Sequence, residues 1–173
     1  RPQLLDRFAL SVDIRGIRDA RERVQIMERN IGHKEIDTMF GGAIEKVRAN
    51  IDELSALDSA TGDGDHGTAM NKAMNAIEKA LEESGDSGLK DLLYNIGWAV
   101  MCIDGGSTGP LLGSLFMGMS ESVSDATELD CSLLAAMFEG GLGGVQKQSK
   151  AQIGDKTMMD ALDPAVAAIR KAC

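Results

Sequence analysis

Residues 36–70, IDTMFGGAIEKVRANIDELSALDSATGDGDHGTAM, decide the fold class of this chain. In the first part of this stretch, apolar residues recur every three or four positions, as they do on one face of a helix. These residues are Ile36, Phe40, Ile44, Val47, Ile51 and Leu54. A helix therefore leads into the glycine-rich loop "GDGDHG" at 62–67. That loop matches a G-x-G-x-x-G pattern, but a dinucleotide-binding fold requires a strand before the glycines, so this fold is excluded.

The rest of the chain repeats the helical pattern. Apolar stripes predict helices over 70–81, 89–100, from Pro110, from 129 to 137 and over 157–171. Glycine-rich stretches are expected to interrupt them at 83–88, 104–109, 140–144 and 153–157. Aromatic residues make up only 3% of the chain, so Ala, Leu, Ile and Met must fill the core. The sequence predicts an all-α bundle.

Residues 1–32 are expected to be an N-terminal extension, followed by one helical domain over 33–173. The extension alternates in a strand-like manner at 8–14 and has a charged, helix-like pattern at 17–29, and no role is assigned to it. The net charge of −9 disfavours nucleic acid and anionic membranes as partners. No apolar run approaches the roughly 20 residues of a membrane span, and no signal peptide is visible. The scattered Cys102, Cys131 and Cys173 are expected to be reduced thiols of a cytoplasmic protein.

Three carboxylates lie in or next to the glycine-rich loop: Asp58, Asp63 and Asp65. An EF-hand is excluded, because position 12 of such a loop would be Met74 instead of Glu. Oxygen ligands suit Mg²⁺, which commonly lies between carboxylates and the phosphates of a substrate. Free amides of the helix that begins near Thr68 can bind a phosphate oxygen. The alternative is a solvated turn, in which Asp and Gly act only as turn formers.

Two further loops have a similar composition. "GGSTGP" at 105–110 places Ser107 and Thr108 at a helix start, as a second anion cradle or as an ordinary N-cap. "SKAQIGDKTMMDAL" at 149–162 places Lys150 and Lys156 near a Gly-Asp turn, where they either meet phosphate or lie on a solvated surface. Each loop alone is a weak signal, but together they favour one ligand site built from helix-entry loops.

Three motifs resemble the nucleotide-binding L subunit, or L domain, of dihydroxyacetone kinases. They are "LDSATGDGDHG" at 57–67, "GGSTGPLLG" at 105–113 and "GVQKQSKAQIGDKTMMDAL" at 144–162, and the resemblance runs from about Ile36 to Ala172. It implies an antiparallel helical barrel with the nucleotide bound at one end. The chain departs from the family pattern at Ala69, where Asn is usual, and at Gln148-Ser149, where Arg-Gly is usual. The family also continues beyond the position of Cys173 with a further helical segment.

The resemblance implies a role for each matching residue. Asp58, Asp63 and Asp65 match the ligands of two Mg²⁺ ions. The implied nucleotide contacts are His66, Gly67, Thr68 and the position of Ala69 at the start of one helix, Gly106, Ser107 and Thr108 in the second loop, and Ser149 and Met158 in the third, with Met158 beside the base. No catalytic side chain is assigned to this chain.

The resemblance also implies a reaction divided between two proteins. A phosphoryl group moves from a Mg-bound nucleotide, ATP or rephosphorylated ADP, to dihydroxyacetone or a similar short ketose. A partner K subunit holds this ketose covalently. The donor is either exchanging ATP or a phosphotransferase-system protein that rephosphorylates retained ADP, and the motifs do not separate these modes. One alternative is a non-catalytic Mg·nucleotide-binding regulatory module. Another is a plain helical interaction domain.

Overall fold

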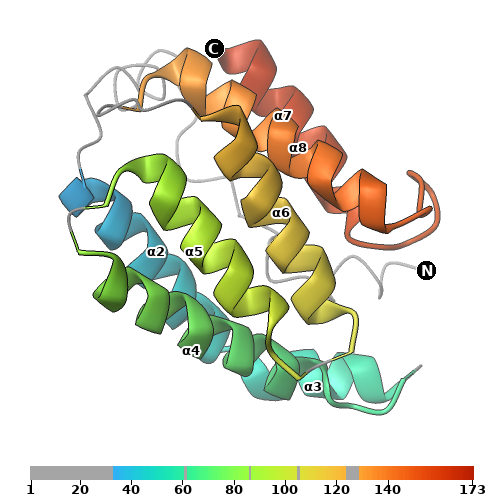
Figure 1. Ribbon diagram of the computed structural model, residues 1–173. Helices are drawn as coiled ribbons and strands as arrows, with labels where there is room; N and C mark the ends of the chain where they lie inside the picture. Colours follow the sequence, from blue (N-terminus) through green and yellow to red (C-terminus); the bar gives the residue numbers. More distant parts are fainter. Residues whose placement is uncertain (1–32, 61, 86, 105, 124–128) are drawn as a thin grey trace.

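The computed structural model describes residues 33–60, 62–85, 87–104, 106–123 and 129–173. The strand-like and helical patterns expected within 1–32 lie outside these ranges. Within them the chain forms seven α-helices and no β-strand, which confirms the all-α class. The helices are α2 (His33–Arg48), α3 (Ile51–Ser59), α4 (His66–Ser84), α5 (Leu89–Met101), α6 (Thr108–Ser122), α7 (Cys131–Gln148) and α8 (Met159–Ala172) (Figure 1).

The helices form a bundle in which each long helix packs along the next one in the sequence. From α4 to α8, consecutive helices run in opposite directions, and α2 packs against α4 (Figure 1). As a result, the α3–α4 and α5–α6 connections lie together at the lower end of the bundle, and the α7–α8 connection lies higher, at its right-hand side (Figure 1). These are the three loops that the sequence singled out.

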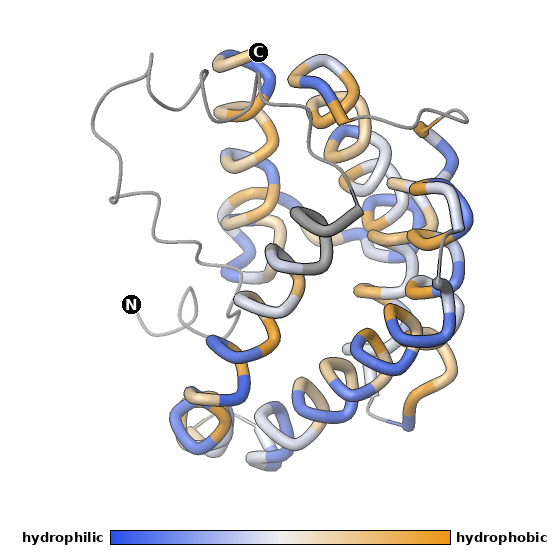
Figure 2. The backbone as a smooth tube through the Cα atoms, turned by 90° about the vertical axis from the view of Figure 1, so that its left-hand side faces the viewer, coloured by the Kyte–Doolittle hydropathy of each residue, from blue (hydrophilic) through white to orange (hydrophobic). Residues whose placement is uncertain are grey.

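The core of the bundle is aliphatic, as the composition predicts. The largest fully buried side chains are Leu92, Leu93, Ile96, Val100, Val123 and Val145. Along most helices, hydrophobic stretches alternate with hydrophilic ones, as expected for helices with one buried face (Figure 2). None of the helices in the described ranges combines the length and the apolar character that crossing a membrane requires.

The apolar stripe over 36–54 does not form one continuous helix, because the chain bends between α2 and α3. Asn50 is the N-cap of α3, with φ −118° and ψ 16° outside the helical range. Its side-chain Nδ2 donates to the carbonyl of Lys46 at 2.7 Å, and its own carbonyl accepts from the amide of Leu54 at 2.9 Å. Asn50 thus provides partners for the backbone at the end of one helix and the start of the next, which makes the bend possible.

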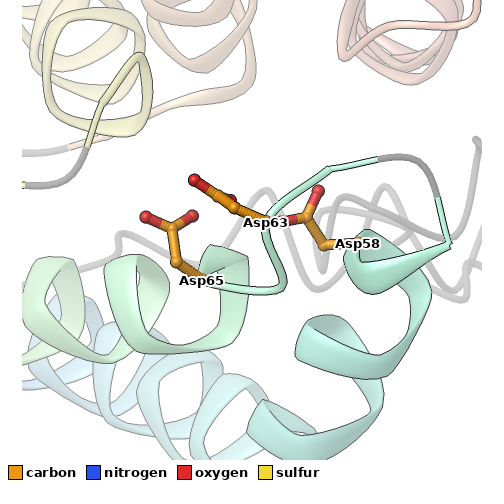
Figure 3. A group of neighbouring side chains, drawn as sticks. All are labelled: Asp58, Asp63 and Asp65. Carbon is orange, nitrogen blue, oxygen red and sulfur yellow. The ribbon is translucent and has the colours of Figure 1, made fainter.

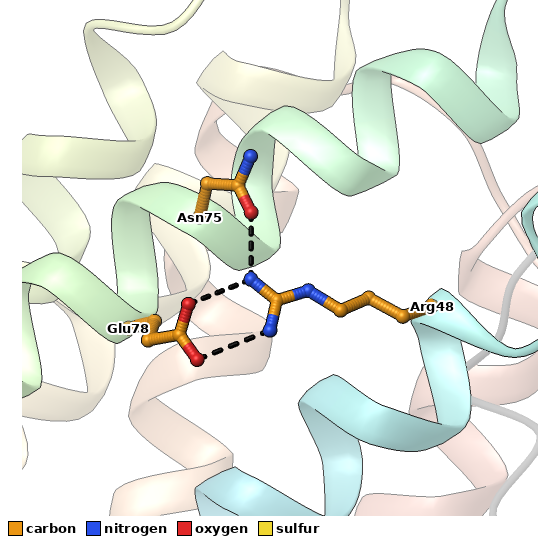
Figure 4. A network of polar contacts seen from close by, with 3 residues as sticks. All are labelled: Arg48, Asn75 and Glu78. Atoms are coloured by element: carbon orange, nitrogen blue, oxygen red, sulfur yellow. Dashed lines mark hydrogen bonds and ion pairs between the residues drawn. The ribbon is translucent and has the colours of Figure 1, made fainter.

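The bend is held in place by a polar contact between α2 and α4. The Nη1 and Nη2 atoms of Arg48 donate to the two carboxylate oxygens of Glu78, at 3.0 Å and 2.7 Å (Figure 4). Nη2 also donates to Oδ1 of Asn75 at 2.6 Å. This fork geometry matches the planar guanidinium to the carboxylate and fixes the end of α2 against the middle of α4.

The prediction that "GGLGG" at 140–144 interrupts the chain is wrong, because these residues lie within α7. They allow α7 to approach α6 closely. A Cβ atom on Gly144 would collide with the carbonyl oxygen of Ser114, and one on Gly118 would collide with that of Gly140. Glycine weakens an isolated helix, but here the loss of a side chain lets two helix backbones meet.

The prediction of three reduced thiols is also wrong. Cys131, at the start of α7, and Cys173, after the end of α8, form a disulfide with their Cα atoms 5.3 Å apart. Cys102 is exposed and free. The disulfide joins the far ends of the antiparallel α7–α8 pair, a pairing that depends on the fold and not on any motif spacing.

Candidate metal centre

Three carboxylates converge where α3 ends and α4 begins. Asp58 lies in the last turn of α3, Asp63 in the connecting loop, and Asp65 at the N-cap of α4 (Figure 3). One oxygen atom of each lies within 4.8 Å of the corresponding oxygens of the other two. Asp58 is buried, with 6% of its surface exposed, whereas Asp63 and Asp65 are exposed. The structure therefore brings together the acidic residues that the sequence singled out.

The glycines of the loop make this convergence possible. Gly64 has a left-handed φ of +77°, and a Cβ atom there would collide with the hydroxyl of Ser59. Its amide donates to Oδ2 of Asp58 at 3.0 Å. Gly67 lies where α4 touches α3, and a Cβ atom there would collide with the carbonyl oxygen of Ile51. The glycines that gave the loop its resemblance to a phosphate-binding loop are thus needed to fold it tightly back on α3.

The carboxylates repel one another electrostatically. The pKa of Asp65 is raised, mainly by the negative charge of Asp63 and further by desolvation, by a hydrogen bond with Asp63 and by the charge of Asp58. His66 acts in the opposite direction and lowers it. A group of like charges at this separation is costly without a cation, so the arrangement favours binding a metal ion.

The donor set fits Mg²⁺. An octahedral magnesium ion binds oxygen ligands at about 2.0–2.1 Å, which places neighbouring ligand oxygens about 3 Å apart and opposite ones about 4 Å apart. Carboxylate oxygens of Asp58, Asp63 and Asp65, one from each, all lie within 4.8 Å of one another, a span comparable with the separation of opposite ligands. Three protein oxygens also leave coordination positions for water and for the oxygens of a phosphate.

Two helices, α4 beside this cluster and α6 after the second loop, begin without a side-chain cap. Asp65 at the start of α4 and Ser107 at the start of α6 make no side-chain hydrogen bond to their own helix. By contrast, the side chain of Asp130 caps α7 by accepting from the amide of Leu133 at 2.7 Å. An anion is the ligand that an uncapped helix N-terminus favours.

The predicted nucleotide contacts differ in accessibility. The candidates His66, Gly67 and Thr68 form the first turn of α4, and Ser107 and Thr108 begin α6 directly after Gly106, whose φ is +57°. Thr68, Gly106 and Ser107 are exposed, and Thr108 is half-buried. Ala69 and Met158, however, are each only 3% exposed and pack in the core. Their side chains are not presented at the surface in this structure.

The third loop, 149–158, begins next to the start of α6. Gly144 in α7 packs against Ser114 in the antiparallel α6, so the end of α7 lies beside the first turns of α6. Ser149 ends α7, and its Oγ accepts from the amide of Ala151 at 3.1 Å. The α5–α6 and α7–α8 loops are therefore neighbours in space, although about 40 residues separate them in the sequence.

Two residues that shape these loops were not recognised from the sequence. Nζ of Lys72 in α4 donates to the carbonyl of Asp104 at 2.9 Å and so ties the helix after the acidic cluster to the second loop. Asp160 accepts from the amides of Gly154 and Thr157 at 2.6 Å and 2.8 Å. The contact of Lys72 joins residues 32 positions apart, so no local pattern in the sequence indicates it. Asp160 could have been recognised, because an acidic residue in the first turn of a helix is typical of a helix start.

Comparison with known proteins shows the family of this chain. A family model described as "DAK2 domain" matches residues 60–173. The ADP-binding subunit DhaL of PEP-dependent dihydroxyacetone kinase 1 from Listeria innocua is 38% identical over 127 residues, which is 73% of this chain and 64% of that protein. The corresponding subunit from Escherichia coli is 34% identical over 118 residues, or 68% of this chain and 56% of that protein.

A eukaryotic protein shows the same likeness over a smaller share of its length. Human triokinase/FMN cyclase is 35% identical over 112 residues, which is 64% of this chain and 19% of that protein. This chain spans less than two thirds of the length of the bacterial subunits that it matches. With a family model that covers more than half of its residues, the chain belongs to the DAK2 domain family.

Proposed function

We propose that this chain is the nucleotide-binding part of a kinase for dihydroxyacetone or a related short ketose. In this proposal it binds ADP or ATP together with two Mg²⁺ ions and presents a phosphoryl group to a ketose held on a partner K subunit. The observation that carries the proposal is the convergence of the Asp58, Asp63 and Asp65 carboxylates within 4.8 Å at the start of α4. The names of the related bacterial subunits, which are ADP-binding subunits of dihydroxyacetone kinases, support it.

Each part of the site contributes a different interaction. Asp58, Asp63 and Asp65 hold the metal, which when bound neutralises phosphate charge and fixes the geometry for phosphoryl transfer. Amides in the first turns of α4 and α6 and the hydroxyls of Ser107 and Thr108 donate to phosphate oxygens. Phosphoryl transfer requires mainly positioning and charge neutralisation, so no general base on this chain is needed.

The remaining proposed contacts involve the backbone more than the side chains. His66, Gly67 and Ala69 contribute through the first turn of α4, since the side chain of Ala69 is buried. Met158 and Ser149 border the base from the third loop, and Met158 must become accessible to touch it. The division into an extension over 1–32 and a helical domain over 33–173, and the cytoplasmic location, stay predictions.

The phosphoryl donor is proposed to act on retained ADP. The relatives from Listeria innocua and Escherichia coli are named as subunits of PEP-dependent kinases, and one from Lactococcus lactis as a subunit of a PTS-dependent kinase. A phosphotransferase-system protein is then the second partner, and ADP is a cofactor that is rephosphorylated in place. Mass spectrometry of the chain purified under native conditions should detect stoichiometric ADP, whereas exchanging ATP would leave little nucleotide bound.

Thermal unfolding tests the metal site directly. Mg²⁺ and ADP bind the folded state, so at ligand about 100-fold above its dissociation constant they should stabilise it by about 2.7 kcal/mol. For a domain of this size, the melting temperature should rise by about 5–10 °C. In Asp63→Asn this rise should be lost, because a metal ligand is missing. The apo variant should melt no lower than wild type, because repulsion with Asp65 is relieved.

Asp52→Asn is the matched control, because Asp52 is an exposed acidic residue on α3 outside the cluster. It should keep the full Mg·ADP shift. If Asp63→Asn also keeps it, the loop is a solvated turn and the metal site is rejected. Addition of a K subunit, a phosphoryl donor and dihydroxyacetone then separates a kinase from a non-catalytic nucleotide-binding module, since only the kinase forms ketose phosphate.

A further inference from the structure

The third loop contains an unusual backbone conformation at Lys156. Among the residues that the structure describes, Lys156 is the only non-glycine residue with a left-handed φ, at 60°. Gly154, two residues earlier, also has a positive φ of +100°. A side chain in this conformation is disfavoured sterically, so surrounding contacts must hold it there.

Asp160, at the start of α8, provides these contacts. Its Oδ1 accepts from the amide of Gly154 at 2.6 Å, and its Oδ2 accepts from the amide of Thr157 at 2.8 Å. One carboxylate thus binds the backbone on both sides of Lys156. The hydrogen bonds from Gly154 and Thr157 lower the pKa of Asp160, so the group is a carboxylate at neutral pH. The turn is therefore held in its shape by the chain itself, before any ligand binds.

The side chain of Lys156 is exposed, and no ion pair joins it to an acidic group in the described part of the chain. Lys147 in the last turn of α7 differs in this respect, since its Nζ lies 3.9 Å from a carboxylate oxygen of Glu121. The loop that holds Lys156 follows α7, and Gly144 in the last turns of α7 packs against Ser114 in α6. Lys156 thus displays an exposed positive charge just before the start of α8, in a protein with a net charge of −9.

We propose that Lys156 binds a phosphate oxygen of the nucleotide and that Asp160 is the positioning residue that holds Lys156 in place for this contact. The inference rests on the proposed function, because it takes the nucleotide to lie between the three loops. Because the turn is fixed before binding, less conformational entropy is lost when the nucleotide binds. Lys156 can therefore contribute more binding free energy than a lysine on a mobile loop.

The test is calorimetric titration of the full chain with ADP in the presence of Mg²⁺. Lys156→Ala should weaken binding about tenfold, and Lys156→Arg should restore it to within about threefold because it keeps the charge. Asp160→Asn should weaken binding to a similar extent, since an amide cannot accept from both backbone groups. The ADP affinity of the double variant Lys156→Ala/Asp160→Asn should be within about twofold of the affinity of either single variant, because both changes remove the same interaction.

Lys150→Ala is the matched control, because Lys150 is an exposed lysine at the other end of the same loop. It should stay within about twofold of wild type. Lys156→Gly separates charge from conformation: it should bind as weakly as Lys156→Ala but melt at a higher temperature, because glycine tolerates the left-handed backbone.

The outcomes distinguish a failure of the Lys156 contact from a failure of the proposed function. If wild type binds Mg·ADP and Lys156→Ala binds within about twofold of it, Lys156 is not a ligand contact, although the proposed function stands. If the single-variant effects add fully in the double variant, Asp160 does not act through Lys156. If wild type shows no magnesium-dependent binding, the proposed function fails and this inference fails with it.

Discussion

The amide of Gly64 donates a hydrogen bond to Oδ2 of Asp58 at 3.0 Å, and this contact ties the acidic loop back to the last turn of α3. It exists because the backbone of Gly64 turns through a left-handed φ of +77°, close to the side chain of Ser59. The buried Asp58 therefore has a partner without a metal ion, and the loop brings Asp63 and Asp65 to it. Loop shape and metal chemistry depend on the same glycine.

Gly64→Ala should destabilise the protein more than Gly106→Ala. Both glycines have a positive φ, +77° and +57°, so both changes carry a conformational cost of about 1–2 kcal/mol. Only the alanine at 64 would also collide with Ser59, since a Cβ on Gly106 meets no atom within 4 Å. Denaturant unfolding of the two variants measures the difference. Equal losses in the free energy of unfolding would show that the contact with Ser59 is relieved at no cost.

Adjacent glycines in α7 should respond in opposite ways to alanine. Gly144→Ala should lower the free energy of unfolding by about 1–3 kcal/mol, because the methyl group forces α7 away from Ser114 in α6. Gly143→Ala is its control: a Cβ there meets nothing within 4 Å, and alanine in a helix gains up to about 1 kcal/mol over glycine. Thermal melts of both variants check the sign. A stabilised Gly144→Ala would contradict the close packing of α6 and α7.

The contact between Arg48 and Glu78 predicts a dependence of stability on pH. The hydrogen bond from Arg48 lowers the pKa of Glu78 in the folded state below its usual 4.5. Stability from this pair is therefore complete above the unfolded pKa and is lost as the pH falls through the folded pKa. Glu78→Gln should lower the melting temperature near pH 7 and have little effect once both states are protonated, at about pH 2.

Glu82→Gln is a suitable control for this prediction. Glu82 is exposed on the same helix and forms no ion pair with any residue that the structure describes. Its effect on the melting temperature should be small at both pH values. If Glu78→Gln destabilises the protein equally at both, the side chain stabilises α4 by packing and not by its charge.

Reduction of the Cys131–Cys173 disulfide should destabilise the helical domain. The bridge closes a sequence separation of 42 residues, for which the chain-entropy model gives about 4 kcal/mol. Unfolding with and without a reductant measures the loss, and the double variant Cys131→Ser/Cys173→Ser should match the reduced protein. Thiol titration of the native protein should find Cys102 alone reactive. Three reactive thiols would restore the expectation drawn from the sequence.

Local patterns in the sequence were sufficient for the fold class and for the acidic cluster. The apolar period of three to four residues predicted helices that correspond to α4, α5, α6, α7 and α8, because burial of one helix face depends on neighbours a turn apart. Asp58, Asp63 and Asp65 lie within eight residues, so their convergence needed only one tight loop between two helices. The short motifs were likewise sufficient to identify the family.

Features that depend on distant parts of the chain were decided only by the tertiary structure. Asn50 bends an apolar stripe that is compatible with one continuous helix, and Arg48 holds the bend through Glu78, 30 residues away. "GGLGG" reads as a break, yet it continues α7 because α6 lies against it. Helix periodicity is a local property, whereas close backbone approach, disulfide pairing and the contact of Lys72 with Asp104 require knowing which helices become neighbours.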